Sequence, residues 1–435
     1  MTRNKGAEEQ RSRGAEEQRG RGNVTDPSAP LPHGSSAPPL SRASTFAKGL
    51  PRSAIIIGLV SLLSDISGEM IYPILPLFLT ETLHAPATVL GLIEGVAVGA
   101  STAIGGFSGW ISDRIGRRKP VAFAGYALTA LTRPMIAAAQ VWTVVLGARF
   151  AERFGKGVRN APRDALLAES TPEDYRGRAF GFERAMDSAG AVIGPVVALV
   201  LVGWLGVGAR SIFLISGIPA MLAAFLILTV REPASSSTSS TSRPKFSLAG
   251  TTSEYRRLLF VTAVFGFANS ANAFLILRSE QLGLDRKWTF LAYAFYNAVA
   301  ALASMPAGAA SDRFGRRNVL IMGFVVYAVS YAGFGAASEG WMVWPLFAVY
   351  GLFPALTDGV GKAMAVDAAG TAGRGTVIGI YSMVVGLTQI AASYIGGLLW
   401  DKVDSRATFY FGAALSAVAA ALLVLLLRSP DRRTA

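Results

Sequence analysis

The sequence GWISDRIGRRKPV, residues 109–121, returns with small changes as GAASDRFGRRNVL at residues 308–320. A second pair of related segments, RGRAFG at residues 176–181 and RGTVIG at residues 374–379, is separated by almost the same interval. A repeat that keeps its spacing over such a distance indicates a duplicated unit. We therefore interpret the chain as two related halves.

Each copy of the longer segment lies between two apolar runs, which predicts a tight turn joining two membrane helices. Gly109 lets a neighbouring helix approach closely, and Gly116 suits the left-handed conformation that ends a helix. Asp113 would lie at the negative end of a helix dipole, so it needs a positive partner. The helix starts in the opposite halves, at residues 374 and 176, are the expected partners of Asp113 and Asp312.

Length and composition indicate a membrane protein. The chain has 435 residues, of which 51% are hydrophobic and only 16% are charged. Apolar runs of about 20 residues, each able to cross a hydrocarbon core of about 30 Å, occur twelve times. The expected helices cover residues 53–80, a stretch ending near 112, 120–139, 142–168, two stretches ending near 231, 256–279, 288–311, 318–337, 341–367, 375–400 and 406–428.

The net charge of +13 could indicate a nucleic-acid partner, but Lys and Arg are concentrated in the N-terminal tail and in the loops of one side. This distribution follows the positive-inside rule, so both termini are expected in the cytoplasm and the protein in the cytoplasmic (inner) cell membrane. We expect no nucleic-acid partner. With no cysteine and two histidines, the chain has little material for a metal site or a catalytic triad. No enzyme activity, metal or cofactor is therefore expected.

Polar segments delimit the halves. Residues 1–50 are rich in Arg, Glu, Gly, Ser and Pro, which predicts a disordered tail. A later Ser/Thr-rich stretch is typical of a flexible linker. The predicted domains are a basic cytoplasmic tail at 1–50, an N-terminal six-helix bundle at 51–232, a cytoplasmic linker at 233–255, a C-terminal six-helix bundle at 256–428 and a cytoplasmic tail at 429–435.

The repeated G-x-x-x-D-R-x-G-R-R segment resembles the signature loop of the major facilitator superfamily, and the resemblance covers nearly all of the chain after residue 52. It implies an all-α membrane fold of twelve transmembrane helices in two pseudo-symmetric six-helix bundles. It also implies a secondary transporter that works by alternating access. The resemblance implies a gating role for the loop residues Gly109, Asp113, Arg114, Gly116, Arg117, Asp312 and Arg316.

A glycine motif in the fifth helix resembles that of the proton-antiporter branches of the family. A closing glycine pair is replaced here by Ala198 and Leu199. The same glycines are equally typical of a small-residue contact between helices, as are Gly91, Gly95 and Gly99 in the second helix. The residues of the fifth-helix motif are Gly181, Gly190, Gly194 and Pro195.

Charged residues inside a membrane are costly and mark candidate functional groups. In the helix at 142–168, Arg153, Lys156 and Gly157 resemble a family motif in which an arginine is linked with proton coupling. Counted inward from the cytoplasmic side, Glu183 lies at the depth of Arg163, and Asp187 lies at the depth of Lys156 or Arg159. This predicts ion pairs between the two helices at these depths. These cations belong to a stripe with spacings of three and four, which lies on one helix face: Arg149, Glu152, Lys156, Arg159 and Arg163.

Asp65 and Glu69 lie four residues apart near the middle of the first helix, so both are expected to face one cavity. Because two like charges this close ionise together only at a cost, we expect one carboxyl to hold a proton that couples transport. A permanently paired carboxylate that fixes helix packing is the alternative. The candidate coupling or cavity residues are Asp65, Glu69, Glu94, Arg133, Arg153, Lys156, Arg159 and Asp187. The candidate substrate wall is Asn269, Asn272, Tyr293, Asn297, Asp358 and Lys362.

The sequence thus predicts a secondary transporter of a small organic solute, with proton-coupled efflux as the first interpretation. A proton-coupled uptake symporter of an organic anion and a transporter-like receptor or scaffold are the alternatives. The expected partners are a small-molecule substrate, protons and the lipid bilayer, and the chain is expected to act as a monomer. The charge of the substrate stays open. An anion suits an unpaired cationic stripe in the fourth helix, and a lipophilic cation suits free Asp65 and Glu69.

Overall fold

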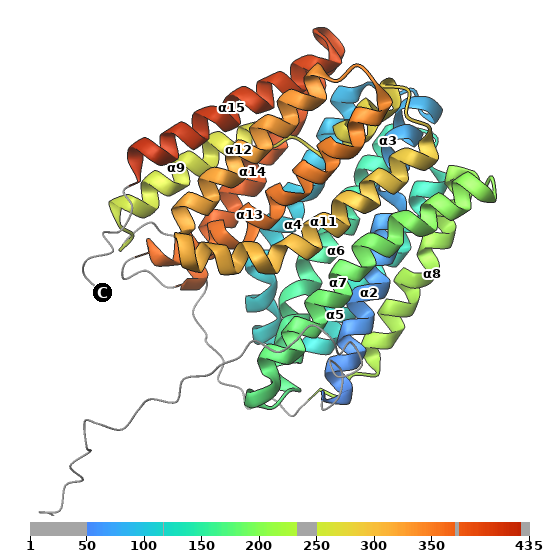
Figure 1. Ribbon diagram of the computed structural model, residues 1–435. Coiled ribbons are helices and arrows are strands. Elements are labelled where there is room, and N and C mark those ends of the chain that lie inside the picture. The colour runs from blue at the N-terminus through green and yellow to red at the C-terminus, as the bar shows by residue number, and fades with distance from the viewer. Residues whose placement is uncertain (1–49, 116, 233–249, 370–373, 428–435) are drawn as a thin grey trace, which may run out of the picture. The chain divides into compact units, whose positions relative to one another are not determined.

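The structure is a computed structural model that describes residues 50–115, 117–232, 250–369 and 374–427. All regular secondary structure in these residues is helical. The predicted tail at 1–50 and most of the predicted linker at 233–255 lie outside the described residues. Figure 1 traces the helices along the chain.

The helices of the first half follow the expected order. The first crossing consists of α2 (Arg52–Ile71), α3 (Leu75–Leu77) and a π-helical turn at Phe78–Thr82. The others are α4 (Ala87–Ile115), α5 (Arg118–Ala138), α6 (Trp142–Glu169), α7 (Arg176–Leu199, continued by a π-helical turn at Val200–Trp204) and α8 (Ala209–Leu228).

The second half repeats this order. Its first crossing consists of α9 (Ser253–Ala268) and α10 (Ala273–Gln281). The others are α11 (Arg286–Phe314), α12 (Arg316–Ala336), α13 (Val343–Asp367), α14 (Arg374–Lys402) and α15 (Ser405–Leu426). Short 3-10 turns at Glu173–Tyr175 and Gly340–Met342 precede α7 and α13.

Ten of these crossings, counted within the described residues, are long and apolar enough to span a membrane. The other two are α4, whose apolar segment is Ala87–Thr102, and α6, which carries a charged residue at nearly every turn. The predicted all-α fold with twelve crossings is confirmed. Below, the motif side is the side where α11 ends and α12 begins, and the far side is where α4 begins and α14 ends.

The first crossing of each half is broken, whereas the sequence predicted continuous helices at 53–80 and 256–279. The first break follows Ile71, because Pro73 has no N–H to donate and its ring clashes with the preceding turn. The second break spans Asn269–Asn272, where Asn269 leaves the helical region with φ −82° and ψ 78°. Interrupted helices at corresponding places of two repeats point to a binding site between them.

Glycines set two of the closest helix contacts. On α7, a Cβ added to Gly190 would lie 2.9 Å from Cβ of Asp65, and one added to Gly194 would lie 2.7 Å from Cβ of Glu69. These two glycines therefore allow α7 to pack directly on the part of α2 that carries both carboxyl groups. The expected small-residue contact is confirmed for this pair.

The turn between α11 and α12 has the predicted glycine conformation. Gly315 has φ 90°, a conformation that residues with side chains rarely adopt, and it is the single residue between the end of α11 and the start of α12. Its counterpart Gly116 lies outside the described residues, so the same conformation there stays a prediction.

Candidate functional site

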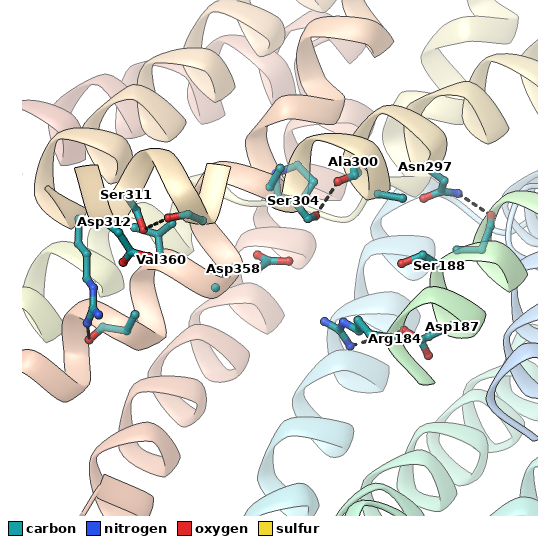
Figure 2. Close-up of a pocket in the computed structure, with 18 residues that line it drawn as sticks. Arg184, Asp187, Ser188, Asn297, Ala300, Ser304, Ser311, Asp312, Asp358 and Val360 are labelled. Atoms are coloured by element: carbon teal, nitrogen blue, oxygen red, sulfur yellow. Dashed lines mark hydrogen bonds and ion pairs between the residues drawn. The ribbon is translucent and has the colours of Figure 1, made fainter. Parts of the chain in front are cut away.

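A cavity of about 540 Å³ lies among α7, α11, α12 and α13. Its lining extends from Asn297 in the middle of α11 to Arg316 at the motif side. Figure 2 shows Asp187 and Ser188 on one wall, Asn297 and Ser304 along α11, and Asp358 on the opposite wall. A cavity of this volume accommodates a drug-sized solute.

The predicted substrate wall is only partly in this cavity. Asn297 and Asp358 line it, together with Asp187, Asp312 and Arg316. Tyr293 is buried deeper, where it donates a hydrogen bond to Glu69 over 3.3 Å and stacks on Tyr72. Three other predicted wall residues are not in the lining: Asn269 ends α9, Asn272 bonds Tyr296 and Tyr350, and Lys362 is exposed near the end of α13.

Asp65 and Asp187 form the contact between α2 and this cavity. Their carboxyl groups lie close enough to interact with each other, and Lys156 of α6 lies 3.4 Å from Asp65. Two carboxylates this close ionise together only at a cost. The pair is therefore a candidate for holding a proton beside the large cavity.

A second, small cavity of about 20 Å³ lies beside Asp65. Asp65 and Glu69 both line this small cavity, and neither lines the large one. The volume suffices for a single water molecule. The lining also contains four predicted cations, together with Glu152 and small or polar residues; the cations are Arg133, Arg153, Lys156 and Arg159. Within the described part of the chain, Arg153 forms no ion pair, and its buried Nε has no hydrogen-bond partner.

The other buried charges form a network with little exposure to solvent. Arg149 of α6 binds both carboxylate oxygens of Glu94 on α4, at 2.8 and 3.0 Å, and also binds Glu152 at 2.6 Å. Glu152 also binds Arg133 of α5 at 3.0 Å. Arg133 and Arg149 are at most 1% exposed. These four residues thus join α4, α5 and α6, which matches the alternative of a permanent salt bridge for Glu94.

The predicted ion pair between α6 and α7 is confirmed at one position. Arg163 binds Glu183 at 2.9 Å, and Ser61 of α2 donates a hydrogen bond to the same carboxylate. Arg159 instead binds the hydroxyl groups of Ser64 and Thr129. The expected pairing of Asp187 with a cation of α6 is corrected: the ion-pair partner of Asp187 is Arg184, one turn away on α7 at 3.5 Å.

Contacts across the far side join the two halves. The Asp401 carboxylate at the end of α14 accepts hydrogen bonds from the backbone N–H groups of Ala87 and Thr88, at 3.0 and 2.7 Å. It also accepts one from the Thr88 hydroxyl at 2.6 Å. Asp401 therefore caps the positive end of α4 from the other half. Nearby, Arg286 binds both carboxylate oxygens of Glu81, at 2.8 and 2.9 Å.

Asp401→Asn is expected to weaken the closed far side by about 1–2 kcal/mol, because it removes charged hydrogen bonds to a helix start. The population open on the far side should rise by about tenfold. Spin labels on Thr82→Cys and Val403→Cys would report this as longer distances, and the chain has no other cysteine. Glu339→Gln, an exposed substitution on the same side, is the control. Unchanged distances in Asp401→Asn would contradict the assigned role.

The motif loops are described only in part. Gly109 lies within α4. Gly116 and the side chains of Asp113, Arg114 and Arg374 lie outside the described part, so the expected contact of Asp113 with the start of α14 stays a prediction. In the second loop, Arg316 binds Asp367 and the Ala363 carbonyl, and Asp312 lines the large cavity.

Comparisons with known proteins identify the family. The model of the Major Facilitator Superfamily matches residues 57–298 and 258–435. An uncharacterized MFS-type transporter of Methanocaldococcus jannaschii is 32% identical over 384 residues, covering 87% of this chain and 95% of that protein. The class D tetracycline resistance protein of Salmonella ordonez is 25% identical over 397 residues, covering 87% and 98%. Among solved structures, a mutant of the nucleoside transporter NupG is similar with a TM-score of 0.75 at 14% identity, covering 87% and 100%.

The chain belongs to the major facilitator superfamily. It is a multi-pass membrane protein and a secondary transporter of small molecules, with the fold of two pseudo-symmetric six-helix bundles. The large cavity lies between helices of both halves, α7 of the first and α11, α12 and α13 of the second.

Proposed function

We propose that the protein is a proton-coupled antiporter that exports a small organic solute across the cytoplasmic cell membrane. The observation that carries this proposal is the contact between the carboxyl groups of Asp65 and Asp187, with Lys156 3.4 Å from Asp65. We propose that this pair holds a titratable proton at the wall of the solute cavity, where proton release and solute binding influence each other. The similarity to a tetracycline resistance protein supports export, since export of a toxic compound confers resistance.

The arrangement of the gates supports alternating access. Asp401 and Arg286 hold the far side together, while the cavity lining continues to Asp312 and Arg316 at the motif side. Arginines are concentrated in the motif-side loops, so we assign that side and both termini to the cytoplasm. In this orientation the structure is open to the interior of the cell. We further propose that the protein acts as a monomer and that its domains follow the predicted bounds 51–232 and 256–428.

Each charged group has a part in the proposed cycle. The proton on the Asp65–Asp187 pair leaves when the cavity faces the cytoplasm, and solute then binds to the ionised site. After the far side opens, a proton from outside rebinds and solute is released. Lys156, 3.4 Å from Asp65, stabilises the ionised form of the pair. Glu69 is the neighbouring carboxyl that the small cavity connects to the pair, and a single water there would transfer the proton between them.

Purified protein in proteoliposomes tests the function. Antiport predicts that an acidic vesicle interior drives uptake of the solute, because protons leave as solute enters. Symport predicts the opposite: uptake driven by an alkaline interior. A screen of organic cations, organic anions and sugars under both gradients, with a protonophore as control, separates the two mechanisms. Solute flux that is the same under both gradients would show that transport is not coupled to protons.

A further inference from the structure

Two arginines of the α6 stripe, Arg149 and Arg163, are neutralised by carboxylates from their own helix and its neighbours. Arg149 and Arg133 share Glu94 and Glu152, and Arg163 binds Glu183. These pairs lie within the first half, and none of their members lines the large cavity. Within the described residues, Arg153 and Arg159 form no ion pair, but both line the small cavity and neither lines the large one. The stripe therefore offers no positive charge to an anionic solute in the large cavity.

The charges that face the large cavity have the opposite balance. Three carboxylates, those of Asp187, Asp312 and Asp358, line it together with two guanidinium groups, those of Arg184 and Arg316. The positive charge of Arg316 is compensated from outside the lining by Asp367. Within the described residues, Asp312 and Asp358 form no ion pair, and Lys362 from outside the lining interacts electrostatically with Asp358. When the Asp65–Asp187 pair is ionised, the lining therefore carries more carboxylates than guanidinium groups.

One side chain of the protein already occupies this negative space. Arg184 extends from α7 into the cavity (Figure 2), and its side chain is 77% exposed. It binds Asp187 at 3.5 Å and interacts electrostatically with Asp358 across the cavity. A long, exposed side chain with one weak ion pair is easily displaced. Arg184 thus acts as an internal cation that a dissolved cation can replace.

We propose that the solute is a lipophilic organic cation, held in the cavity between Asp358 of α13 and Asp187 of α7 in place of Arg184. The apolar part of the solute contacts the small residues Ala191, Ala300 and Ala301, which also line the cavity. This inference names the substrate class of the proposed antiporter and rests on that function. It also explains the exchange, because a cation at Asp187 and a proton on the Asp65–Asp187 pair compete for the same negative charge.

Two ions of nearly the same size and shape but opposite charge, tetraphenylphosphonium and tetraphenylborate, test this substrate class. Equilibrium binding to the purified protein in detergent involves no pH gradient, so the result is independent of proton coupling. Tetraphenylphosphonium should bind and tetraphenylborate should not. Asp358→Asn should weaken phosphonium binding by about tenfold or more, because the bound cation loses a desolvated partner. Arg184→Gln should strengthen it, because the competing internal cation is removed.

The control is Glu173→Gln, which neutralises an exposed carboxylate in the loop before α7 and should leave binding unchanged. Melting temperatures confirm that each variant is folded. Failure of tetraphenylphosphonium to bind, equal binding of the borate, or full binding by a folded Asp358→Asn variant would each overturn the inference. Phosphonium binding without flux under a pH gradient would refute proton coupling alone. Proton-driven flux of a neutral or anionic solute, without phosphonium binding, would refute only the substrate class.

Discussion

Asp65→Asn is expected to abolish solute accumulation driven by a pH gradient, while solute exchange at equal pH on both sides survives in part. The amide cannot bind and release a proton in this pH range. The Asp65–Asp187 pair therefore loses the carboxyl group needed both for proton release to the cytoplasm and for proton uptake from outside. Glu69→Gln should have the same effect if Glu69 passes the proton to the pair through the small cavity. Radiolabelled solute in proteoliposomes, with and without an imposed gradient, measures both quantities.

Glu173→Gln again provides the matched control, because it removes an exposed carboxylate that lines neither cavity. It should retain accumulation and exchange. An Asp65→Asn protein that still accumulates solute against its gradient would exclude Asp65 from coupling, and the same holds for Glu69. Loss of exchange together with accumulation would instead indicate a role in solute binding or in the fold, which the melting temperature separates.

Glu152→Gln is expected to destabilise the protein by about 3–5 kcal/mol, because it removes the carboxylate shared by two buried guanidinium groups. Arg149 would keep Glu94, but Arg133 would have no carboxylate partner and would keep only neutral ones such as Ser67 at 3.0 Å. A buried cation without a carboxylate partner is costly. The thermal unfolding of the purified protein in detergent should shift clearly to lower temperature.

A double variant tests whether the lost stability comes from the unpaired charge of Arg133. Arg133→Met combined with Glu152→Gln removes the stranded cation as well, so part of the lost stability should return. The exposed pair Arg176–Glu173 serves as the comparison, and its removal should cost no more than about 1 kcal/mol. If Glu152→Gln unfolds at the wild-type temperature, the network contributes nothing to stability.

The architecture was predictable because it depends on patterns that extend over many residues. The repeated loop at 109–121 and 308–320 indicated two halves, and apolar length indicated the crossings. The breaks in the first crossing of each half were missed, although Pro73 was a visible signal for the first one. The second break had no such signal, because Asn269–Asn272 contains neither proline nor glycine.

The sequence indicated many of the residues that belong to the site, but not which of them contact one another. Helical spacing placed Asp65 and Glu69 on one cavity, and depth matched Arg163 with Glu183. Depth alone could not select partners from the other neighbouring helices. Lys156 is at the depth of Asp187 but binds Asp65, because α2 lies between α6 and α7 at that level. The role of Asp401 was missed, since a carboxylate in a short outer loop looks like ordinary surface charge until its partner on α4 is known.

The close packing of α4 on α14 has a consequence for the leakage of protons through the protein. A Cβ added to Gly95 would lie 2.9 Å from Cα of Ile390, and one added to Gly397 would lie 2.5 Å from Cα of Thr88. Main chain therefore packs directly on main chain at both positions, which leaves little room for water there. The proposed antiporter must not let the proton gradient run down while idle. Close packing of α4 on α14 would limit such a leak, and opening the far side would require the two helices to separate.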